Sequence, residues 1–308
     1  MITSLQHLAF GVPALQAGVD FYEAFGLETV DRQDHVAFRC HGRSQDQILL
    51  LETGQDRTVH HISFGADEAG LKAIAARLQV MATPLLDPPY VGAPDGLWFR
   101  DPDGHLVNVQ VAQAATTRAE EGAPVANTPG RILRSGVRGC PTPDLTTKPR
   151  RMGHFILFTP NVPRQLRFYA DVLGMRVSDT LQDEYGAFLR IPGDSDHHVV
   201  GFLNSPAPGF HHASFEMGSI DETALAAVKL VGKGYRHAWG PGRHAIGSNY
   251  FHYFRDPWNG MAEYFHDIDF IPESFNWEPK DWTKKDGMFL WSADGPPPSD
   301  FGKNYTIA

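Results

Sequence analysis

Cysteine is scarce in this chain, which has only Cys40 and Cys140 among its 308 residues. Two cysteines so far apart form neither a disulfide framework nor a paired zinc motif. We therefore expect two inert thiols in a reducing compartment, the cytoplasm. Long apolar runs are also absent, so the sequence predicts no membrane-spanning helix. The first residues, MITSLQHLAF, lack a basic start followed by an apolar stretch and predict no signal peptide.

Positive charge is in short supply as well. The chain has 27 Lys and Arg against 36 Asp and Glu, a formal net charge of −9. A protein that wraps nucleic acid needs a basic face, so we exclude nucleic acid as a partner. Hydrophobic residues make up 42% and charged residues 20%, as in an ordinary globular chain. A chain of 308 residues is long enough for two domains, each with its own core.

The second half of the chain repeats the first. Three pairs of strings match in the same order. They are LQHLAFGVPALQAGVDFYEAFGLETVD with MGHFILFTPNVPRQLRFYADVLGMRVSD, HHISF with HHASF, and FRDPDGHLVNVQ with FRDPWNGMAEYF. The separation between matched residues grows only slowly along the chain, as expected of a duplicated domain with small loop insertions.

This repeat predicts four regions. They are an N-terminal domain at 1–112, a linker at 113–150, a C-terminal domain at 151–268 and a tail at 269–308. Within each domain a strand, a helix and short alternating stretches occur twice, and a capping-box pattern at Ser219–Glu222 opens the last of these helices. The predicted fold class is α+β, with tandem βαβββ modules paired within each domain into curved, barrel-like mixed sheets.

Three residues in strand-like segments of the second copy are candidate metal ligands: His154, His212 and Glu263. They lie far apart in the sequence, so only folding can bring them together. Glu263 lies between two apolar residues, where a buried carboxylate requires a partner. Two imidazoles and one carboxylate form the facial triad of non-haem Fe(II) oxygenases, which leaves coordination positions open. Because side chains alternate across a strand, we expect His212 and its neighbour His211 to face opposite sides.

The strings GHFILFTPNVPRQLRFYADVLGM, DHHVVGF, HHASFEM and GPGRHAIGSNYFHYFRDPWNGMAEYF resemble the type I extradiol dioxygenases of the vicinal oxygen chelate superfamily. The resemblance covers residues 1–268 and is most specific at 240–264. It implies an Fe(II)-dependent enzyme, with Mn(II) as the alternative metal. Such an enzyme opens the ring of a catecholic substrate beside its vicinal diol with O2, giving a hydroxymuconic semialdehyde-type product.

The resemblance also assigns roles to individual residues. It places the metal ligands on the three candidates named above. It places the distal acid/base histidine on His198, a second active-site histidine on His244 and the substrate-binding tyrosine on Tyr253. By composition alone His197 fits as well as His198, His244 could be an ordinary loop residue, and Tyr253 could simply pack in a core strand.

The first copy keeps His7 and His61 but has Asn108 where the second has Glu263. A neutral amide is a weaker partner for a dication, so we predict that the first domain is metal-free. The tail is rich in large aromatic residues, which predicts that it folds over the site as a lid. It contains no Arg, the residue that an anionic ring substituent would be expected to find. A neutral catechol is therefore favoured.

Two other functions fit the same scaffold. A glyoxalase-like isomerase or lyase also binds vicinal oxygens on a metal, but it consumes no dioxygen. A non-catalytic drug-binding protein of the same superfamily needs no metal. The His-His-Glu set, together with His198 and Tyr253, favours the dioxygenase. We expect a small-molecule partner and a homo-oligomer.

Overall fold

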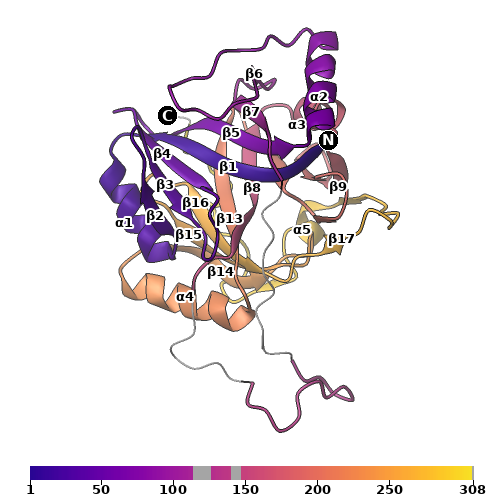
Figure 1. The fold of residues 1–308 in the computed structure, drawn as a ribbon. Coiled ribbons are helices and arrows are strands. Elements are labelled where there is room, and N and C mark those ends of the chain that lie inside the picture. The colour runs from indigo at the N-terminus through magenta and orange to yellow at the C-terminus, as the bar shows by residue number, and fades with distance from the viewer. Residues whose placement is uncertain (114–125, 140–146, 307–308) are drawn as a thin grey trace.

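The computed structural model describes residues 1–113, 126–139 and 147–306, and its two halves form two curved mixed sheets (Figure 1). The first sheet has the strand order β2-β3-β4-β1-β5-β7-β6. The elements of this half are β1 (Ile2–Val12), α1 (Leu15–Phe25), β2 (Glu28–Asp31), β3 (Val36–Arg39), β4 (Ile48–Glu52), β5 (Thr58–Ala66), α2 (Glu68–Val80), β6 (Leu97–Arg100) and β7 (Leu106–Val111).

The second sheet has the order β18-β9-β10-β12-β8-β13-β16-β15-β14-β19 and includes two short strands of the tail. Its domain consists of β8 (Arg151–Thr159), α3 (Val162–Asp171), β9 (Arg176–Leu181), β10 (Gly186–Arg190), β11 (Ser195–Asp196), β12 (Val200–Asn204), β13 (Gly209–Glu216), α4 (Ile220–Gly232), β14 (His237–Arg243), β15 (Tyr250–Arg255) and β16 (Met261–His266). The tail adds β17 (Phe270–Ile271), β18 (Lys280–Trp282), α5 (Lys284–Gly287) and β19 (Trp291–Ser292).

The central strands of the two sheets pair in the same register. In each domain a histidine of the first strand lies opposite a serine, and that serine lies opposite the matched residue of a third strand. The pairs are His7–Ser63 and Ser63–Asn108 in the first domain, and His154–Ser214 and Ser214–Glu263 in the second. The repeat in the sequence is therefore a repeat of the sheet itself, and the predicted α+β fold of paired modules is confirmed.

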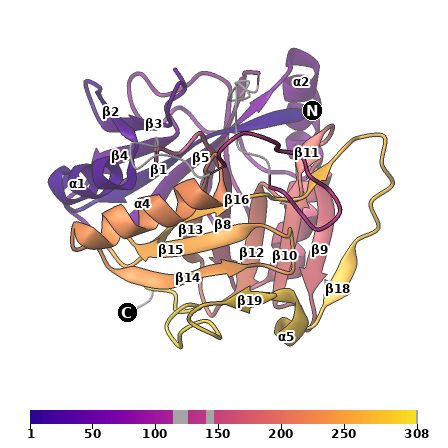
Figure 2. The same ribbon diagram turned by 90° about the horizontal axis from the view of Figure 1, so that it is seen from below.

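Helix α4 begins where its capping residue predicts. The Ser219 side chain accepts a hydrogen bond from the backbone N–H of Glu222 at 3.1 Å, which confirms the predicted start of α4. α1 and α4, one from each domain, lie side by side on one flank of the molecule (Figure 2). None of the helices in the described part of the chain combines the length and the apolar character needed to cross a bilayer.

Strand β13 departs from regular alternation at His211. Phe210 pairs with Leu157 and His212 with Ile156, so β13 has one residue more than β8 at this point. Such a bulge breaks the strict alternation of side chains across the strand. The Nδ1 atoms of His211 and His212 lie 2.6 Å apart, and both rings line one cavity. The expectation that these two histidines face opposite sides is therefore wrong.

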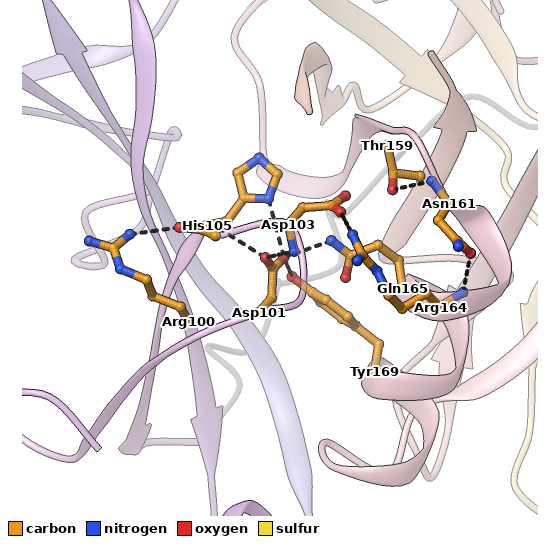
Figure 3. Close-up of polar contacts among 10 residues, drawn as sticks. Arg100, Asp101, Asp103, His105, Thr159, Asn161, Arg164, Gln165 and Tyr169 are labelled. Carbon is orange, nitrogen blue, oxygen red and sulfur yellow. Dashed lines mark hydrogen bonds and ion pairs between the residues drawn. The ribbon is translucent and has the colours of Figure 1, made fainter. Parts of the chain in front are cut away.

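A buried polar network joins the two domains between the β6–β7 turn and α3 (Figure 3). Oδ2 of Asp101 accepts hydrogen bonds from Gln165 Nε2 and Tyr169 OH, both at 3.2 Å. Oδ1 of Asp101 accepts from the backbone N–H groups of Asp103 and His105. Because a buried carboxylate needs its oxygens satisfied, this network fixes the turn of one domain on a helix of the other.

Of the two cysteines, Cys40 is completely buried, and burial raises the pKa of its thiol. A buried thiol that stays protonated is unreactive, in keeping with the inert cysteine expected there. Cys140 lies outside the described residues.

Candidate active site

Three side chains from three adjacent strands of the second sheet converge: His154 on β8, His212 on β13 and Glu263 on β16. The Nε2 atom of each imidazole lies 3.3 Å from Oε2 of Glu263. One ligand atom from each residue lies within 4.8 Å of the other two. All three side chains are buried, and Glu263 is fully so. The fold thus brings together the three candidate ligands.

The two imidazoles stabilise the negative charge of Glu263. Burial alone would raise the pKa of this carboxyl, but the facing rings of His154 and His212 outweigh burial and hold the pKa below its ordinary range. The 3.3 Å contacts are not aligned as hydrogen bonds, so Glu263 Oε2 and His212 Nε2 are buried without a hydrogen-bond partner. Converging donor atoms that do not satisfy one another fit a divalent cation bound among them.

The two histidine ligands differ in the contacts of their Nδ1 atoms, which point away from Glu263. Nδ1 of His212 contacts Nδ1 of His211 at 2.6 Å, an arrangement that fixes the ring and leaves Nε2 toward Glu263. Burial lowers the pKa of both of these histidines, which favours neutral rings. Nδ1 of His154 is buried and has no hydrogen-bond partner in the described part of the chain.

The other three residues named from the resemblance lie around the same cluster. The His198 ring centroid is 4.2 Å from that of His154. Tyr253 on β15 lies directly opposite Glu263 on β16. His244, which follows β14, has its Nε2 atom 3.9 Å from Oε1 of Glu263. The structure therefore places all six residues at one site.

His244 and Tyr253 form a pair whose protonation follows from its partners. Nδ1 of His244 lies 2.6 Å from the carbonyl oxygen of Met288, which can only accept, so Nδ1 carries the proton. Nε2 of His244 then accepts the hydroxyl hydrogen of Tyr253 at 2.8 Å. Burial lowers the pKa of His244 to about 4 and raises the pKa of Tyr253. Both groups are neutral near pH 7.

The cluster faces a small cavity of about 50 Å³. Its lining is mainly aromatic and apolar and includes three residues of the tail: Gly287, Met288 and Phe301. Pockets that hold drug-sized ligands measure about 300 Å³ or more, so a substituted ring requires some of this lining to move. A larger hollow of about 640 Å³ lies between the two domains, and none of the six site residues lines it.

Sequence reasoning missed one residue that touches the cluster. Asn249 is 1% exposed, and its Nδ2 donates a hydrogen bond to Oε1 of Glu263 at 3.2 Å. This contact fixes the carboxylate so that its other oxygen faces the two imidazoles. Asn249 belongs to an irregular stretch between β14 and β15, where no periodicity could have indicated which way its side chain points.

The corresponding place in the first domain is built differently. Nε2 of His7 contacts Nε2 of His61 at 2.9 Å. Asn108 accepts a hydrogen bond from the Ser63 hydroxyl at 2.7 Å, and the Trp98 ring packs against His61 with its centroid 5.1 Å away. Within the residues that the structure describes, the cluster around Glu263 is the only group of three or more His, Cys, Asp or Glu placed to hold a metal.

Known proteins resemble this chain over most of its length. The family model described as "Glyoxalase/Bleomycin resistance protein/Dioxygenase superfamily" matches residues 4–109 and 151–264. Metapyrocatechase 2 of Cupriavidus necator is 35% identical over 299 residues, which cover 96% of this chain and 90% of that protein. The manganese-dependent 2,3-dihydroxybiphenyl 1,2-dioxygenase of Geobacillus genomosp. 3 is 24% identical over 295 residues, which cover 92% and 90%.

Among solved structures, the Mn(II)-bound glyoxalase of Novosphingobium aromaticivorans superimposes with a TM-score of 0.76 at 24% identity. The superposition covers 97% of this chain and 93% of the glyoxalase. At such identity the structural match bears on the fold alone.

Proposed function

We propose a metal, a substrate class and residue roles for this chain, which belongs to the extradiol ring-cleavage dioxygenases of the glyoxalase/bleomycin resistance protein/dioxygenase superfamily. The observation that carries the proposal is the convergence of Nε2 of His154 and His212 on Oε2 of Glu263, at 3.3 Å each. This donor set is typical of non-haem Fe(II) oxygenases, and Fe(II) is the metal we propose, although the same ligands also suit Mn(II). A metal held by these three residues would bind the diol and O2 and would supply a path for electrons between them.

The proposed substrate is a catechol. The relative that is 35% identical carries the name metapyrocatechase 2. The ring opens beside the diol, both atoms of O2 enter the product, and the product is of the hydroxymuconic semialdehyde type. Neither the cavity lining nor the tail at 269–308 contains an Arg, which favours a ring without an anionic substituent.

Three side chains beside the ligands would orient the diol and move its protons. On substrate binding, the Tyr253 hydroxyl and the Nε2 atom of His244 would give up their mutual hydrogen bond and hydrogen-bond the diol oxygens, which fixes the ring for reaction. His198, whose ring packs on that of His154, would accept a substrate proton at Nε2 and return it later. A neutral imidazole suits both transfers because its ordinary pKa is close to the working pH.

The rest of the chain would shape and cover the site. We propose that the domain at 1–112 is metal-free, because Asn108 there makes a neutral hydrogen bond in place of a charged contact. The tail would act as a lid, since Phe301 packs on Tyr253 with ring centroids 5.0 Å apart and Met288 accepts from His244. Truncation after Asp267 should lower turnover or change the preference among catechols. Unchanged kinetics would contradict the lid.

We also propose that the chain works as a homo-oligomer in the cytoplasm. Ile132, Leu133 and Val137, in the connecting segment, are 67%, 50% and 67% exposed. Apolar side chains gathered at a surface are typical of contacts between proteins. Light scattering on the purified chain should report a mass larger than the 34.1 kDa of one copy, and replacement of these three residues by Ser should lower that mass.

The central experiment is oxygen uptake. Protein reconstituted anaerobically with Fe(II) is mixed with a panel of catechols in an oxygen electrode, and absorbance is recorded. We expect uptake of one O2 per catechol and a yellow ring-fission product. Iron-loaded protein that consumes no O2 with any catechol favours a glyoxalase-like isomerase or lyase. Failure to retain iron or manganese after reconstitution favours a drug-binding protein.

A further inference from the structure

A line of buried side chains runs from His198 away from the cavity. Nδ1 of His198 lies 3.1 Å from Nδ1 of His197, and Nε2 of His197 lies 3.2 Å from Oδ2 of Asp179. His197 is completely buried, while His198 and Asp179 are 4% and 3% exposed. The function proposed above gives a role to His198 but none to His197 and Asp179, which lie behind it.

The partners of Asp179 determine where the protons lie along this line. Its Oδ1 accepts the backbone N–H of Lys280 and its Oδ2 accepts the indole N–H of Trp282, both at 2.8 Å. A carboxylate that accepts these bonds has no proton to give, so His197 must donate to it from Nε2. A neutral imidazole with its proton on Nε2 can only accept at Nδ1. His198 therefore donates from Nδ1.

This chain of donors leaves Nε2 of His198 without a proton. In the described part of the chain the hydrogen bond of the His198 ring is the one at Nδ1, and the ring lines the cavity next to His154. A neutral ring with its lone pair on Nε2 is the form that can take a proton from a bound hydroxyl.

The tail takes part in the same line. Strand β18 pairs in parallel with β9, with Lys280 opposite Asp179. The Trp277 ring packs against His197 with centroids 5.4 Å apart, and its indole N–H donates to the carbonyl of Ser178 at 2.8 Å. The segment that supplies two donors to the carboxylate thus belongs to the tail, which links its docking to the protonation of His198.

We propose that Asp179 and His197 are positioning residues that hold His198 in the tautomer protonated at Nδ1, with Nε2 free to act as the base, and that the docked tail holds Asp179 in place. The proposal rests on the role given to His198 above and adds what fixes the protonation of that base. Histidines that act in catalysis commonly need such an outer partner to select the tautomer.

The test compares variants that alter one bond each. Asp179→Asn introduces an amide that can donate to His197 and so reverse both tautomers. Trp282→Phe removes a different donor from the same carboxylate and leaves His197 with its acceptor. His197→Leu removes the acceptor of His198, whereas the side-chain oxygen introduced by His197→Asn lies near the position of Nδ1 and can replace it.

Two readouts separate this proposal from the function on which it rests. In the full chain labelled with ¹⁵N-histidine and loaded with diamagnetic Zn(II), long-range ¹H–¹⁵N spectra report which nitrogen of His198 is protonated. We expect Nδ1 in the wild type, in Trp282→Phe and in His197→Asn, and Nε2 in Asp179→Asn. In Fe(II)-loaded protein, kcat for oxygen uptake should fall by about 10²- to 10⁴-fold in Asp179→Asn and His197→Leu with little change in KM.

Several outcomes would overturn the proposal. A wild-type His198 protonated at Nε2 would do so, as would an unchanged tautomer in Asp179→Asn. Equal loss of kcat in Trp282→Phe and Asp179→Asn would show that the carboxylate only anchors the tail, and equal loss in the two His197 variants would rule out the acceptor role. The expected wild-type tautomers in a protein that consumes no O2 with any catechol would support the hydrogen-bonded line and contradict the dioxygenase role.

Discussion

The two domains place the same two histidines on the same strands and differ at the third position. In the first domain Asn108 lies opposite Trp98, and in the second Glu263 lies opposite Tyr253. The first domain thus has a neutral amide opposite an indole, where the second has a carboxylate opposite a phenol hydroxyl. The sheet is the same in both domains, so the fold alone does not make the site.

The histidine pairs respond to this difference. Without a carboxylate, the Nε2 atoms of His7 and His61 contact each other at 2.9 Å. With one, the Nε2 atoms of His154 and His212 each turn to Glu263 at 3.3 Å. The two pairs therefore differ by a single buried charge. Without it, the imidazoles of His7 and His61 contact each other; with it, those of His154 and His212 converge on a third ligand.

The largest effect is expected from Glu263→Gln, which makes the second domain resemble the first. The amide keeps the length of the side chain and removes its charge. We expect the affinity for Fe(II) to fall by at least about 100-fold, because even residues that only support a ligand contribute about 10- to 100-fold. Oxygen uptake should fall to background. Metal analysis and calorimetric titration check this, with Asn108→Ala as the matched control; a variant that retains one tightly bound metal per chain would contradict it.

A smaller loss is expected from Tyr253→Phe, which removes the hydroxyl that faces Glu263. The variant should keep its metal and lose about 10- to 100-fold in kcat/KM for catechols, the effect of one hydrogen bond to a charged group. Trp98→Phe, at the matched position of the first domain, should leave kcat/KM unchanged. Steady-state oxygen uptake over a range of catechol concentrations decides between these results. Equal losses in both variants would mean that the first domain influences the reaction.

Asn108→Glu makes the reverse change. The new carboxylate would lie beside His7 and His61 at the register position that Glu263 occupies in the second domain. Without a cation it is a buried unpaired charge, which costs several kcal/mol. With a cation it completes a second triad, so bound metal should rise from one to two per chain and added metal should raise Tm. Asn108→Gln is the uncharged control. A metal content that stays at one would show that Trp98 leaves no room for the ion.

Much of the fold and part of the site follow from the sequence. The duplication is visible because matched histidines and a matched Asn and Glu recur in strands whose register the apolar pattern constrains. Spacing and chemistry pointed to His154, His212 and Glu263. Only the resemblance distinguishes His198 from His197, because both are buried in one line, His198 at the cavity and His197 behind it.

Other features depend on contacts between distant segments and could not be predicted. The bulge at His211 exists only in the pairing of β13 with β8. The bond from His244 to Met288 requires the path of an irregular tail, which has no periodicity to read. Asp179 gave no signal either, because its role depends on Trp282, more than a hundred residues later in the chain.

A last prediction concerns the first domain alone, where the two histidines are buried without a carboxylate. Burial lowers the pKa of His7 to about 4 and that of His61 to about 2, whereas both titrate near 6.5 when unfolded. Below pH 6.5 the two histidines therefore bind protons in the unfolded chain but stay neutral in the folded chain. The stability that the neutral pair contributes is complete above that pH and is lost as the pH falls from about 6.5 toward 4, where His7 begins to protonate in the folded state.

The slope of this loss is about 1.4 kcal/mol per pH unit for each histidine that titrates only in the unfolded chain. Replacing His7 and His61 by Leu removes both groups, so the free energy of unfolding of the wild type should fall relative to that of the variant between pH 6.5 and 4. Urea unfolding in the Glu263→Gln background measures the difference, because metal release from the second domain then contributes nothing. Parallel curves for the two proteins would mean that the pair is hydrated or protonated in the folded state, and that the first domain is not the closed, neutral counterpart of the second.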